Sequence, residues 1–463
     1  MNDYARVNVK EFYSGKSVFV TGGTGYLGKA LIEKLLYSCR NIDNIYVLLR
    51  DKKGERACDR VKQIINSTAF ERVRIRNIRY IEKIRPMSGN IGDENLGLSK
   101  ENLDIIKQEV AVVFHLAATV NFNEPLKDAL AINLNGTEEI IKLCKQMTKL
   151  EAFIYVSTAF SNSDLRKIEE KVYPNTLNIE YVRSIAECFP NDEYVISKLV
   201  GNKPNTYTFT KALAEEVVLR AREDLPIAIV RPSIVISALK EPSPGWIDNW
   251  NGATGLFVGM STGVMKVMIG KGDNVTDLVP LDIVINLIIV AAANCRRSSL
   301  QVFNCCTGKS NPITCNQAET IARRATYKHS LNYLPLPFMW FISDTILYNI
   351  LRFALQLIPS YLMDFWLLIN GKRATLLKIQ SRIRRTVELM QFFLLNEWDI
   401  EDSNVRNLLN TLSEEDMDTF HFDVKSINWD ECLENYVLGT RKHLVKNPRR
   451  PDKGHLHINE TMN

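Results

Sequence analysis

A tyrosine and a lysine stand four residues apart in the segment Tyr207-Thr208-Phe209-Thr210-Lys211. In a helix, this spacing places the phenol and the ammonium on one face, a single turn apart. A positive charge favours an ionised phenol, so we expect Lys211 to lower the pKa of Tyr207. Such a phenol can give a proton to a carbonyl oxygen while hydride reaches the carbonyl carbon. The pair indicates carbonyl reduction, although Y-x-x-x-K alone is a common spacing.

Two hydroxyl residues, Ser157 and Thr158, follow directly after the apolar run 153–156. Open α/β sheets bind their ligands at the carboxyl ends of the strands. A hydroxyl there can donate a hydrogen bond to the oxyanion that develops beside the tyrosine. The structural alternative is a hydroxyl that only caps the following turn.

A glycine-rich segment near the N-terminus indicates the reductant. Gly22, Gly25 and Gly28 recur at three-residue spacing between an apolar run and a helical pattern. The first glycine permits a tight turn, the second lets the backbone approach a pyrophosphate, and the third lets helix and strand pack closely. The bare N–H groups at the helix start then face the phosphate charge. We expect cofactor contacts from Thr21, Gly22, Thr24, Gly25, Tyr26, Leu27 and Gly28.

The choice between the two nicotinamide cofactors depends on Arg50, which follows a predicted strand and lies 22 residues after Gly28. An acid at this place would bind the ribose 2′-hydroxyl of NAD, whereas a guanidinium suits the 2′-phosphate of NADP. Asp51 follows directly, and Lys52 and Lys53 add positive charge. The sequence therefore favours NADPH.

The elements that would position these residues alternate from residue 16 to about 300, short apolar runs with helical patterns. Nearly continuous apolar runs are typical of strands that helices cover on both faces. The sequence thus predicts an α/β fold: a doubly wound parallel Rossmann sheet with a C-terminal, mostly α-helical domain. The predicted strands after the first are 45–49, 110–115, 152–157 and 227–231.

The length of 463 residues predicts more than one domain. We expect an N-terminal segment (1–15), an NADP-binding reductase domain with substrate-binding insertions (16–330), an apolar segment (331–371), a helical domain (372–446) and a polar tail (447–463). The part of the reductase domain over 163–205 is expected to form part of the substrate entrance.

Composition narrows the class of protein. A net charge of +5 is too small to indicate nucleic acid, but it suits an anionic cofactor, an anionic substrate or a membrane surface. The nine cysteines form no C-x-x-C pair, and the six histidines form no metal-binding motif. We therefore expect a reducing compartment and no structural metal. The polar N-terminus does not resemble a signal peptide.

The stretch 333–369 is strongly apolar, but Asp344, Arg352 and Asp364 interrupt it and leave no clean spanning segment. A basic amphipathic pattern follows over 372–385. This order is typical of a protein that lies on an anionic membrane. The alternative is a hydrophobic helical subdomain with a solvated basic face.

Longer motifs carry a resemblance that covers nearly the whole chain. They are the segments 21–28, 113–122, 132–137, 156–159, 201–207, 231–235, 241–249, 392–398, 420–423 and 427–429. Together they resemble the extended short-chain dehydrogenase/reductases, and within them the alcohol-forming fatty acyl-CoA reductases of the male-sterility type, insect branch. The segment 241–249, with Pro244-Gly245-Trp246, is the most specific, because generic dehydrogenases lack it.

The resemblance implies an enzyme that takes a long-chain fatty acyl-CoA through an aldehyde to a primary alcohol, using two NADPH. It implies Thr158, with Ser157 adjacent, as oxyanion donor, Tyr207 as general acid, and Lys211 as its partner and ribose ligand. It further implies that Ala117 and Ala118 line the adenosine and ribose side, and that Pro232 and Ser233 approach the nicotinamide. Gly89 is followed by Asn90, whereas the family usually has a glycine followed by aspartate at this place. Asparagine can still hydrogen-bond an adenine.

The expected setting is intracellular, on the cytosolic face of the endoplasmic reticulum or peroxisome, and an oligomer is possible. Three other functions remain open. The first is a nucleotide-sugar epimerase or dehydratase, which would have no use for the apolar stretch. The second is a thioester reductase that stops at the aldehyde. The third is a catalytically silent, membrane-associated protein that binds acyl-CoA or nucleotide.

Overall fold

The computed structural model describes residues 8–51, 54–175, 177–190, 192–329 and 338–445. They form two compact units. Unit 1 contains the described residues up to Ser233 together with Leu281–Lys309 and Trp398–Val424, and unit 2 contains the rest. The predicted polar tail, Lys52, Lys53 and the first residues of the predicted apolar segment (331–337) lie outside the described residues.

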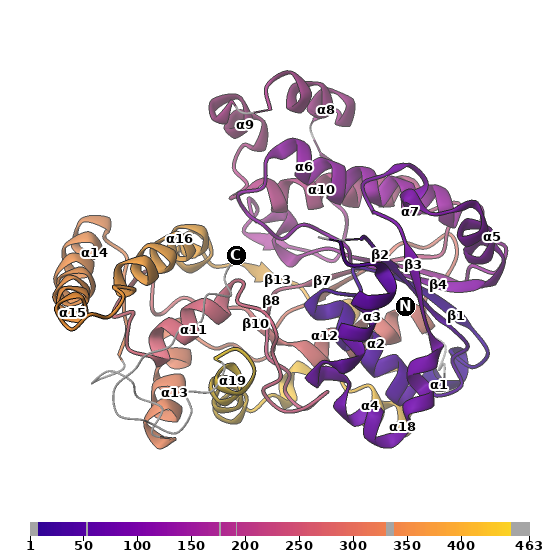
Figure 1. Ribbon diagram of the computed structural model, residues 1–463. Coiled ribbons are helices and arrows are strands. Elements are labelled where there is room, and N and C mark those ends of the chain that lie inside the picture. The colour runs from indigo at the N-terminus through magenta and orange to yellow at the C-terminus, as the bar shows by residue number, and fades with distance from the viewer. Residues whose placement is uncertain (1–7, 52–53, 176, 191, 330–337, 446–463) are drawn as a thin grey trace. The chain divides into compact units, whose positions relative to one another are not determined.

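Unit 1 is built on a parallel sheet with the strand order β11-β7-β5-β4-β1-β2-β3 (Figure 1). The order reverses beside β1, as in a doubly wound sheet. Its strands in chain order are β1 (Ser17–Thr21), β2 (Ile45–Leu49), β3 (Ile84–Ser88), β4 (Val110–His115), β5 (Ala152–Val156), β7 (Ile227–Pro232) and β11 (Gln301–Cys305).

Helices cover both faces of this sheet. The layer on one face includes α2 (Tyr26–Ser38) and α12 (Leu281–Ala293), and the other layer includes α5 (Lys100–Glu109), α7 (Gly136–Cys144) and α10 (Thr206–Arg220) (Figure 1). Every residue of β1, β2, β4, β5 and β7 is therefore buried, which explains their continuous apolar runs. The predicted doubly wound parallel sheet is confirmed.

The parallel register aligns the strand ends that carry the predicted site. Thr21 pairs with His115, His115 with Tyr155, and Val156 with Val230. The residues that follow β1, β4, β5 and β7 consequently leave the sheet at one common edge. The glycine turn, Ser157 and Thr158 all belong to this carboxyl edge.

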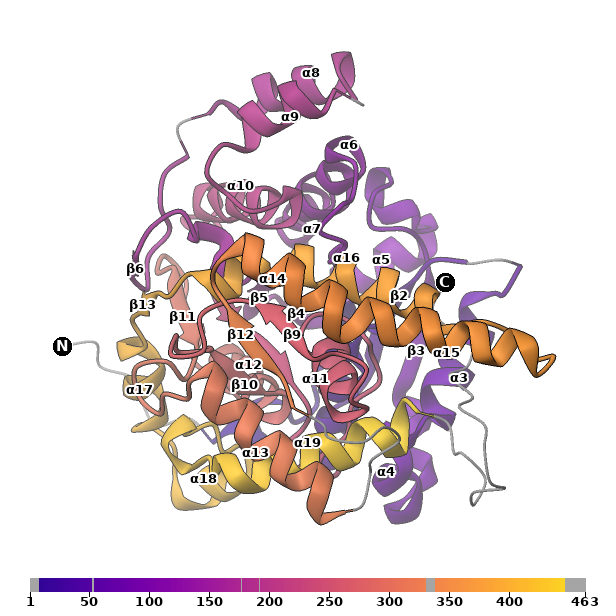
Figure 2. The ribbon, with the colours of Figure 1, turned by 90° about the vertical axis from the view of Figure 1, so that its left-hand side faces the viewer.

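The remaining elements of unit 1 connect or flank the strands. They are α1 (Val9–Phe12), α3 (Ala57–Asn66), η1 (Thr68–Phe70), α4 (Glu71–Arg76), η2 (Ile78–Lys83), η3 (Glu94–Gly97), α6 (Leu126–Leu130), η4 (Ala131–Asn135), η5 (Ala159–Asn162), β6 (Lys167–Ile168), α8 (Ile179–Cys188), α9 (Glu193–Val200), β13 (Asp399–Ile400), α17 (Ser403–Leu409) and α18 (Glu414–Thr419). The predicted substrate entrance over 163–205 contains α8 and α9, which lie beyond α6 and α10 in both views (Figures 1 and 2).

Unit 2 is mostly helical. Its helices are α11 (Ala253–Ser261), α13 (Cys315–Lys328), α14 (Thr345–Arg352), η6 (Phe353–Leu357), α15 (Ile358–Ile369), α16 (Leu376–Leu395) and α19 (Trp429–His443). Two short parallel pairs accompany them, β8 (Ile234–Ile236) with β10 (Leu278–Pro280) and β9 (Val267–Ile269) with β12 (Trp340–Ile342). The predicted helical character of the C-terminal region is confirmed.

The Pro244-Gly245-Trp246 motif has a packing role in unit 2. Gly245 has a φ of +74°, and a Cβ there would stand 2.1 Å from the carbonyl oxygen of Asn435 in α19. A Cβ on Gly439 would stand 1.7 Å from the Gly245 carbonyl oxygen. The two backbones therefore touch, and each contact position requires glycine.

Candidate active site

Tyr207 and Thr158 meet at the carboxyl edge of the sheet. The side chain of Asn205 caps α10 by accepting from the Thr208 N–H at 2.9 Å, which orders the turn that carries Tyr207. The Tyr207 ring stacks on Phe122 with centroids 5.8 Å apart, and the phenol hydrogen-bonds the Thr158 hydroxyl. Two predicted catalytic groups from β5 and α10 thus point at one place.

The protonation of Tyr207 differs from the expectation. Burial raises the pKa of its phenol to about 12, and the hydrogen bond with Thr158 only partly opposes this rise. The expected lowering by Lys211 is wrong for this structure. The Lys211 ammonium is held by the Val156 carbonyl oxygen at 2.7 Å and the Tyr155 hydroxyl at 3.3 Å. At neutral pH the phenol therefore keeps a proton to donate.

Lys211 is itself perturbed by its surroundings. Burial lowers the pKa of its ammonium to about 7, and the negative charge of Glu215 opposes this fall. Glu215 lies one helical turn after Lys211 on α10. The charge of Lys211 near neutral pH therefore depends on Glu215.

Glu215 also organises the turn after β5, a role that the sequence analysis missed. Its carboxylate accepts from the hydroxyls of Ser157 at 2.5 Å and Ser161 at 3.1 Å. Arg231 of β7 donates to both carboxylate oxygens, at 2.9 and 2.6 Å, and the pair is almost completely buried. The Ser157 hydroxyl is therefore engaged within the protein, whereas its neighbour Thr158 faces Tyr207.

A buried histidine connects the glycine turn to the sheet. His115 Nδ1 and the Thr21 hydroxyl are hydrogen-bonded at 2.7 Å, and Nε2 and the Thr137 hydroxyl at 3.0 Å. Burial lowers the pKa of His115 to about 3, so the ring is neutral at physiological pH. The Thr21 oxygen also accepts from the Ala117 N–H at 3.2 Å. Thr21 thus holds the ends of β1 and β4 together.

The glycine turn has the shape that a dinucleotide requires. A Cβ on Gly22, where φ is +73°, would stand 2.7 Å from the Ala117 nitrogen, and a Cβ on Gly28 would stand 2.2 Å from the Gly22 carbonyl oxygen. Gly25 is the N-cap of α2, and no side chain caps that helix end. The first N–H groups of α2, at Tyr26 and Leu27, therefore stand at a helix N-terminus, where a phosphate group is favoured.

A second guanidinium stands beside the turn, and the sequence analysis missed it. Arg60 of α3 donates to the Arg50 carbonyl oxygen at 2.5 Å and to the Thr24 hydroxyl at 3.5 Å. Asp51 points elsewhere: its carboxylate accepts from the Ala57 N–H at 2.9 Å and the Ser88 hydroxyl at 3.4 Å. Two basic residues, Arg50 and Arg60, therefore stand at the end of β2. The Asp51 carboxylate binds the first N–H group of α3.

The remaining predicted cofactor residues occupy other strand ends. Asn90 follows β3 and donates to the Asp93 carboxylate at 2.8 Å, while Ala117 and Ala118 follow β4 beside the glycine turn. Pro232 ends β7, and Ser233 follows it with 7% exposure. The buried Ser233 hydroxyl has no hydrogen-bond partner within the described part of the chain, so it can serve a bound group.

No cluster of three or more metal-binding side chains occurs among the described residues.

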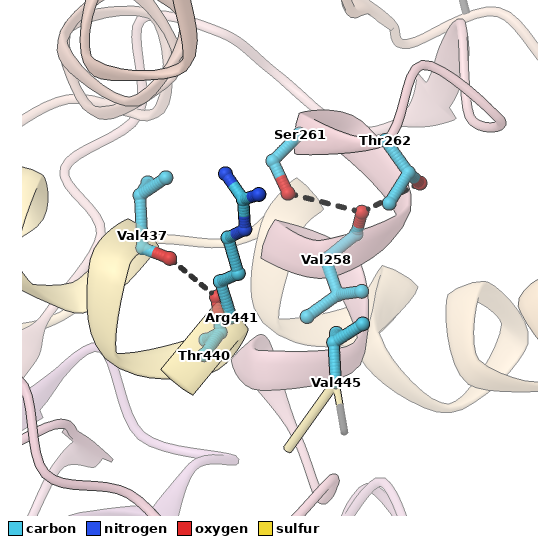
Figure 3. Close-up of a pocket in the computed structure, with 7 residues that line it drawn as sticks. All are labelled: Val258, Ser261, Thr262, Val437, Thr440, Arg441 and Val445. Carbon is cyan, nitrogen blue, oxygen red and sulfur yellow. Dashed lines mark hydrogen bonds between the residues drawn. The ribbon is translucent and has the colours of Figure 1, made fainter. Parts of the chain in front are cut away.

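A small pocket between α11 and α19 of unit 2 is lined by Val258, Ser261, Thr262, Val437, Thr440, Arg441 and Val445 (Figure 3). The Ser261 and Thr262 hydroxyls donate back to the Val258 carbonyl oxygen at 3.2 and 2.8 Å. None of the predicted site residues lines this pocket.

Family models match two parts of the chain. Residues 20–288 match an NAD-binding family described as male sterility protein, and residues 355–447 match a second family with the same description. The first matched range includes the whole candidate site.

Curated relatives align over nearly the full length. Human fatty acyl-CoA reductase 1 is 37% identical over 448 residues, which are 95% of this chain and 86% of that protein. Mouse fatty acyl-CoA reductase 2 is 36% identical over 449 residues, with the same coverage.

Solved structures share the fold at lower identity. The reductase domain of a nonribosomal peptide synthetase from Mycobacterium tuberculosis superposes with a TM-score of 0.64 and 18% identity, over 95% of this chain and 93% of that one. A UDP-glucuronic acid 4-epimerase from Bacillus cereus, solved with NAD, has a TM-score of 0.54 and 13% identity, over 94% of this chain and 99% of that one.

Proposed function

The chain belongs to the fatty acyl-CoA reductase family, and we propose that it reduces a long-chain fatty acyl-CoA to the primary alcohol and CoA with NADPH. The observation that carries this proposal is the contact between the Tyr207 phenol and the Thr158 hydroxyl, with Lys211 buried one turn further along α10. A proton donor and a hydrogen-bond donor that converge on one point are what a reacting carbonyl oxygen requires.

The bound nicotinamide would supply hydride to the carbonyl carbon, first of the thioester and then of the aldehyde. In the first reduction Tyr207 donates its proton to the thioester carbonyl oxygen, and the resulting hemithioacetal collapses to the aldehyde and the CoA thiol, which takes the hydroxyl proton. In the second reduction Tyr207 donates a proton to the aldehyde oxygen, which gives the alcohol. Thr158 donates a hydrogen bond to the oxyanion in both reductions. Ser157 acts as a positioning residue through Glu215, and Lys211 binds the ribose and assists Tyr207.

The cofactor would be held at the carboxyl edge of unit 1. The proposed contacts are Thr21, Gly22, Thr24, Gly25, Tyr26, Leu27, Gly28, Arg50, Asn90, Ala117, Ala118, Tyr207, Lys211, Pro232 and Ser233, with Arg60 in addition. NADPH is favoured over NADH because two guanidinium groups stand at the end of β2 while Asp51 is bound to the start of α3.

Arg60→Gln should raise the KM for NADPH by about 10- to 100-fold, because a hydrogen bond to a charged group contributes about 1.5–3 kcal/mol. The KM for NADH should hardly change, since NADH has no 2′-phosphate. Steady-state kinetics with both cofactors measures the ratio. Lys62→Gln, an exposed change on the same helix, is the matched control. An equal loss with both cofactors in Arg60→Gln would remove the 2′-phosphate assignment.

The reaction itself is tested by its products. Incubation of the purified chain with palmitoyl-CoA and NADPH should give hexadecanol, with two NADPH oxidised for each alcohol formed. Gas chromatography identifies the product. The loss of absorbance by the reduced nicotinamide measures the amount of NADPH oxidised. Aldehyde with one NADPH oxidised would support the aldehyde-forming alternative instead. No turnover of any acyl-CoA would support the silent, ligand-binding alternative.

Other features complete the proposal. We propose a division into segments 1–15, 16–330, 331–371, 372–446 and 447–463, which the two matched ranges support without fixing its boundaries. The motif at 241–249 supports the insect branch of the family. We expect the cytosolic face of the endoplasmic reticulum or peroxisome as the setting, and an oligomer is possible. A membrane setting is supported by Thr345–Ile369, which among the described residues is a helix long and apolar enough to cross a bilayer.

A further inference from the structure

Unit 2 exposes a long apolar helix. The segment Thr345–Ile369 runs continuously through α14, η6 and α15 (Figure 2). Only 17% of its most apolar 18-residue stretch is buried, whereas every residue of the similarly apolar α12 is buried. Its exposed side chains include Ile346, Ile350, Phe353, Leu362, Phe365 and Trp366, each more than half exposed. We call these six residues the apolar surface.

The opposite face of the same helix is polar and firmly bound. Gln356, Ser360 and Asp364 recur at four-residue spacing, which places them on one face, and each is at least 94% buried. The Gln356 side chain accepts from the N–H groups of Lys266 and Val267 at 2.9 and 2.8 Å, and it donates to Gln380 of α16 at 3.2 Å.

Asp364 fixes the other end of this face. Its carboxylate accepts from the N–H groups of Thr375, Leu376 and Leu377, all at 2.9 Å. It therefore caps the start of α16 and stabilises the positive end of that helix dipole. Gln356 and Asp364 together bind the apolar helix to the rest of unit 2 along two turns.

These bonds are incompatible with a spanning position. A helix that crossed a bilayer would carry Gln356 and Asp364 into hydrocarbon and leave the N–H groups of β9 and α16 without acceptors. Each such polar group is expensive to bury unpaired. A helix that lies in the membrane plane keeps every one of these bonds and immerses only the apolar surface.

Charge beside the apolar surface identifies the lipid. The segment 345–395 contains seven lysines and arginines but only two acids, Asp364 and Glu388, and Asp364 is buried. The Lys372 ammonium lies 5.7 Å from the Trp366 ring centroid. Arg382 and Arg385 are exposed on α16, which packs against α15. Cationic side chains next to exposed aromatic rings fit an anionic phospholipid interface.

We propose that the apolar surface lies in the plane of one leaflet of an anionic bilayer and anchors the protein without spanning it. The anchor deepens the proposed function, because long-chain acyl groups concentrate at the same interface. It needs neither a second protein nor a second copy of the chain.

Vesicle flotation with the full chain tests the anchor. Binding to vesicles of phosphatidylcholine with phosphatidylserine should exceed binding to pure phosphatidylcholine and should weaken with salt. The double variant Phe365→Ser, Trp366→Ser should reduce binding by more than about tenfold, since two inserted aromatic side chains are lost. The matched control is Ile75→Ser, Ile78→Ser, which removes two exposed apolar side chains of unit 1 and should bind as the parent does.

Reduction of octanoyl-CoA, which is soluble without vesicles, should stay equal in the parent and both double variants. This readout separates the anchor from the proposed reaction. Unchanged vesicle binding in Phe365→Ser, Trp366→Ser would overturn the anchor. Self-association that these changes abolish, without vesicle binding by the parent, would overturn it in favour of a second copy.

Depth-dependent quenching by brominated lipids distinguishes an in-plane helix from a spanning one. The quenching lost in Trp366→Phe reports the depth near one end of the helix, and the quenching gained in Phe353→Trp reports the depth near its middle. An in-plane helix predicts the same shallow depth at both positions. A bilayer-centre depth at position 353 would show a spanning helix and contradict the proposal.

Discussion

Tyr207→Phe should reduce kcat/KM for acyl-CoA and for aldehyde by about 10²- to 10⁴-fold, the usual contribution of a positioned general acid. The change removes one hydroxyl and leaves the ring stacked on Phe122. Burial keeps that hydroxyl protonated at neutral pH, with its pKa at about 12, so the loss is that of a proton donor. Steady-state NADPH oxidation with each substrate measures the effect.

Tyr436→Phe is the matched control. The Tyr436 hydroxyl donates to the Thr254 hydroxyl at 2.8 Å in the buried core of unit 2, so this change also breaks a buried tyrosine–threonine hydrogen bond. It should lower the free energy of unfolding by about 1 kcal/mol and leave kcat/KM unchanged. Near-normal NADPH oxidation by Tyr207→Phe would remove Tyr207 from the mechanism.

Glu215→Gln should have two separable effects. It leaves the buried Arg231 guanidinium without its counter-charge, which should lower the free energy of unfolding by about 3–5 kcal/mol. It also removes the charge that favours the Lys211 ammonium, so the pKa of Lys211 should fall further below about 7. The alkaline limb of the kcat/KM profile should therefore move to lower pH.

Among the described residues, Glu215 is the charged group that acts on the pKa of Lys211, and the pH profile should depend on it. His115 on β4 and Tyr155 on β5 also face Lys211, but burial keeps both uncharged at neutral pH. Glu33→Gln is the control, because Glu33 is an equally buried carboxylate that pairs with Arg72 at 2.7 Å outside the site. It should lower stability without moving the pH profile. A stability loss with an unmoved limb in Glu215→Gln would reduce Glu215 to a structural role.

The sheet and the main site residues could be predicted because their signals are local. Strands buried on both faces are apolar throughout, and the register then brings the ends of β1, β4, β5 and β7 together. Tyr207 was identifiable because its partner Lys211 lies one turn away, and Thr158 because it directly follows a buried strand.

What could not be predicted depends on contacts between distant segments. Ser157 and Thr158 are adjacent and chemically alike, and only the position of Glu215 on α10, 58 residues later, shows which hydroxyl is engaged. The pKa of Tyr207 depends on burial and on its hydrogen bond with Thr158, which lies 49 residues earlier in the chain. Arg60 required knowledge that α3 returns to the end of β2. The spacing of Gln356, Ser360 and Asp364, by contrast, was a local signal that could have been used.

The glycine-to-glycine contact between Gly245 and Gly439 has a consequence for biosynthesis. The two residues are 194 positions apart, and α19 follows every other helix of unit 2 in the described chain. The ribosome makes the protein from its N-terminus. The turn at Gly245 therefore cannot contact Gly439 of α19 until nearly the whole described chain has been synthesised. Unit 2 is therefore completed late, and a chain released before residue 439 lacks the backbone surface against which this turn is shaped.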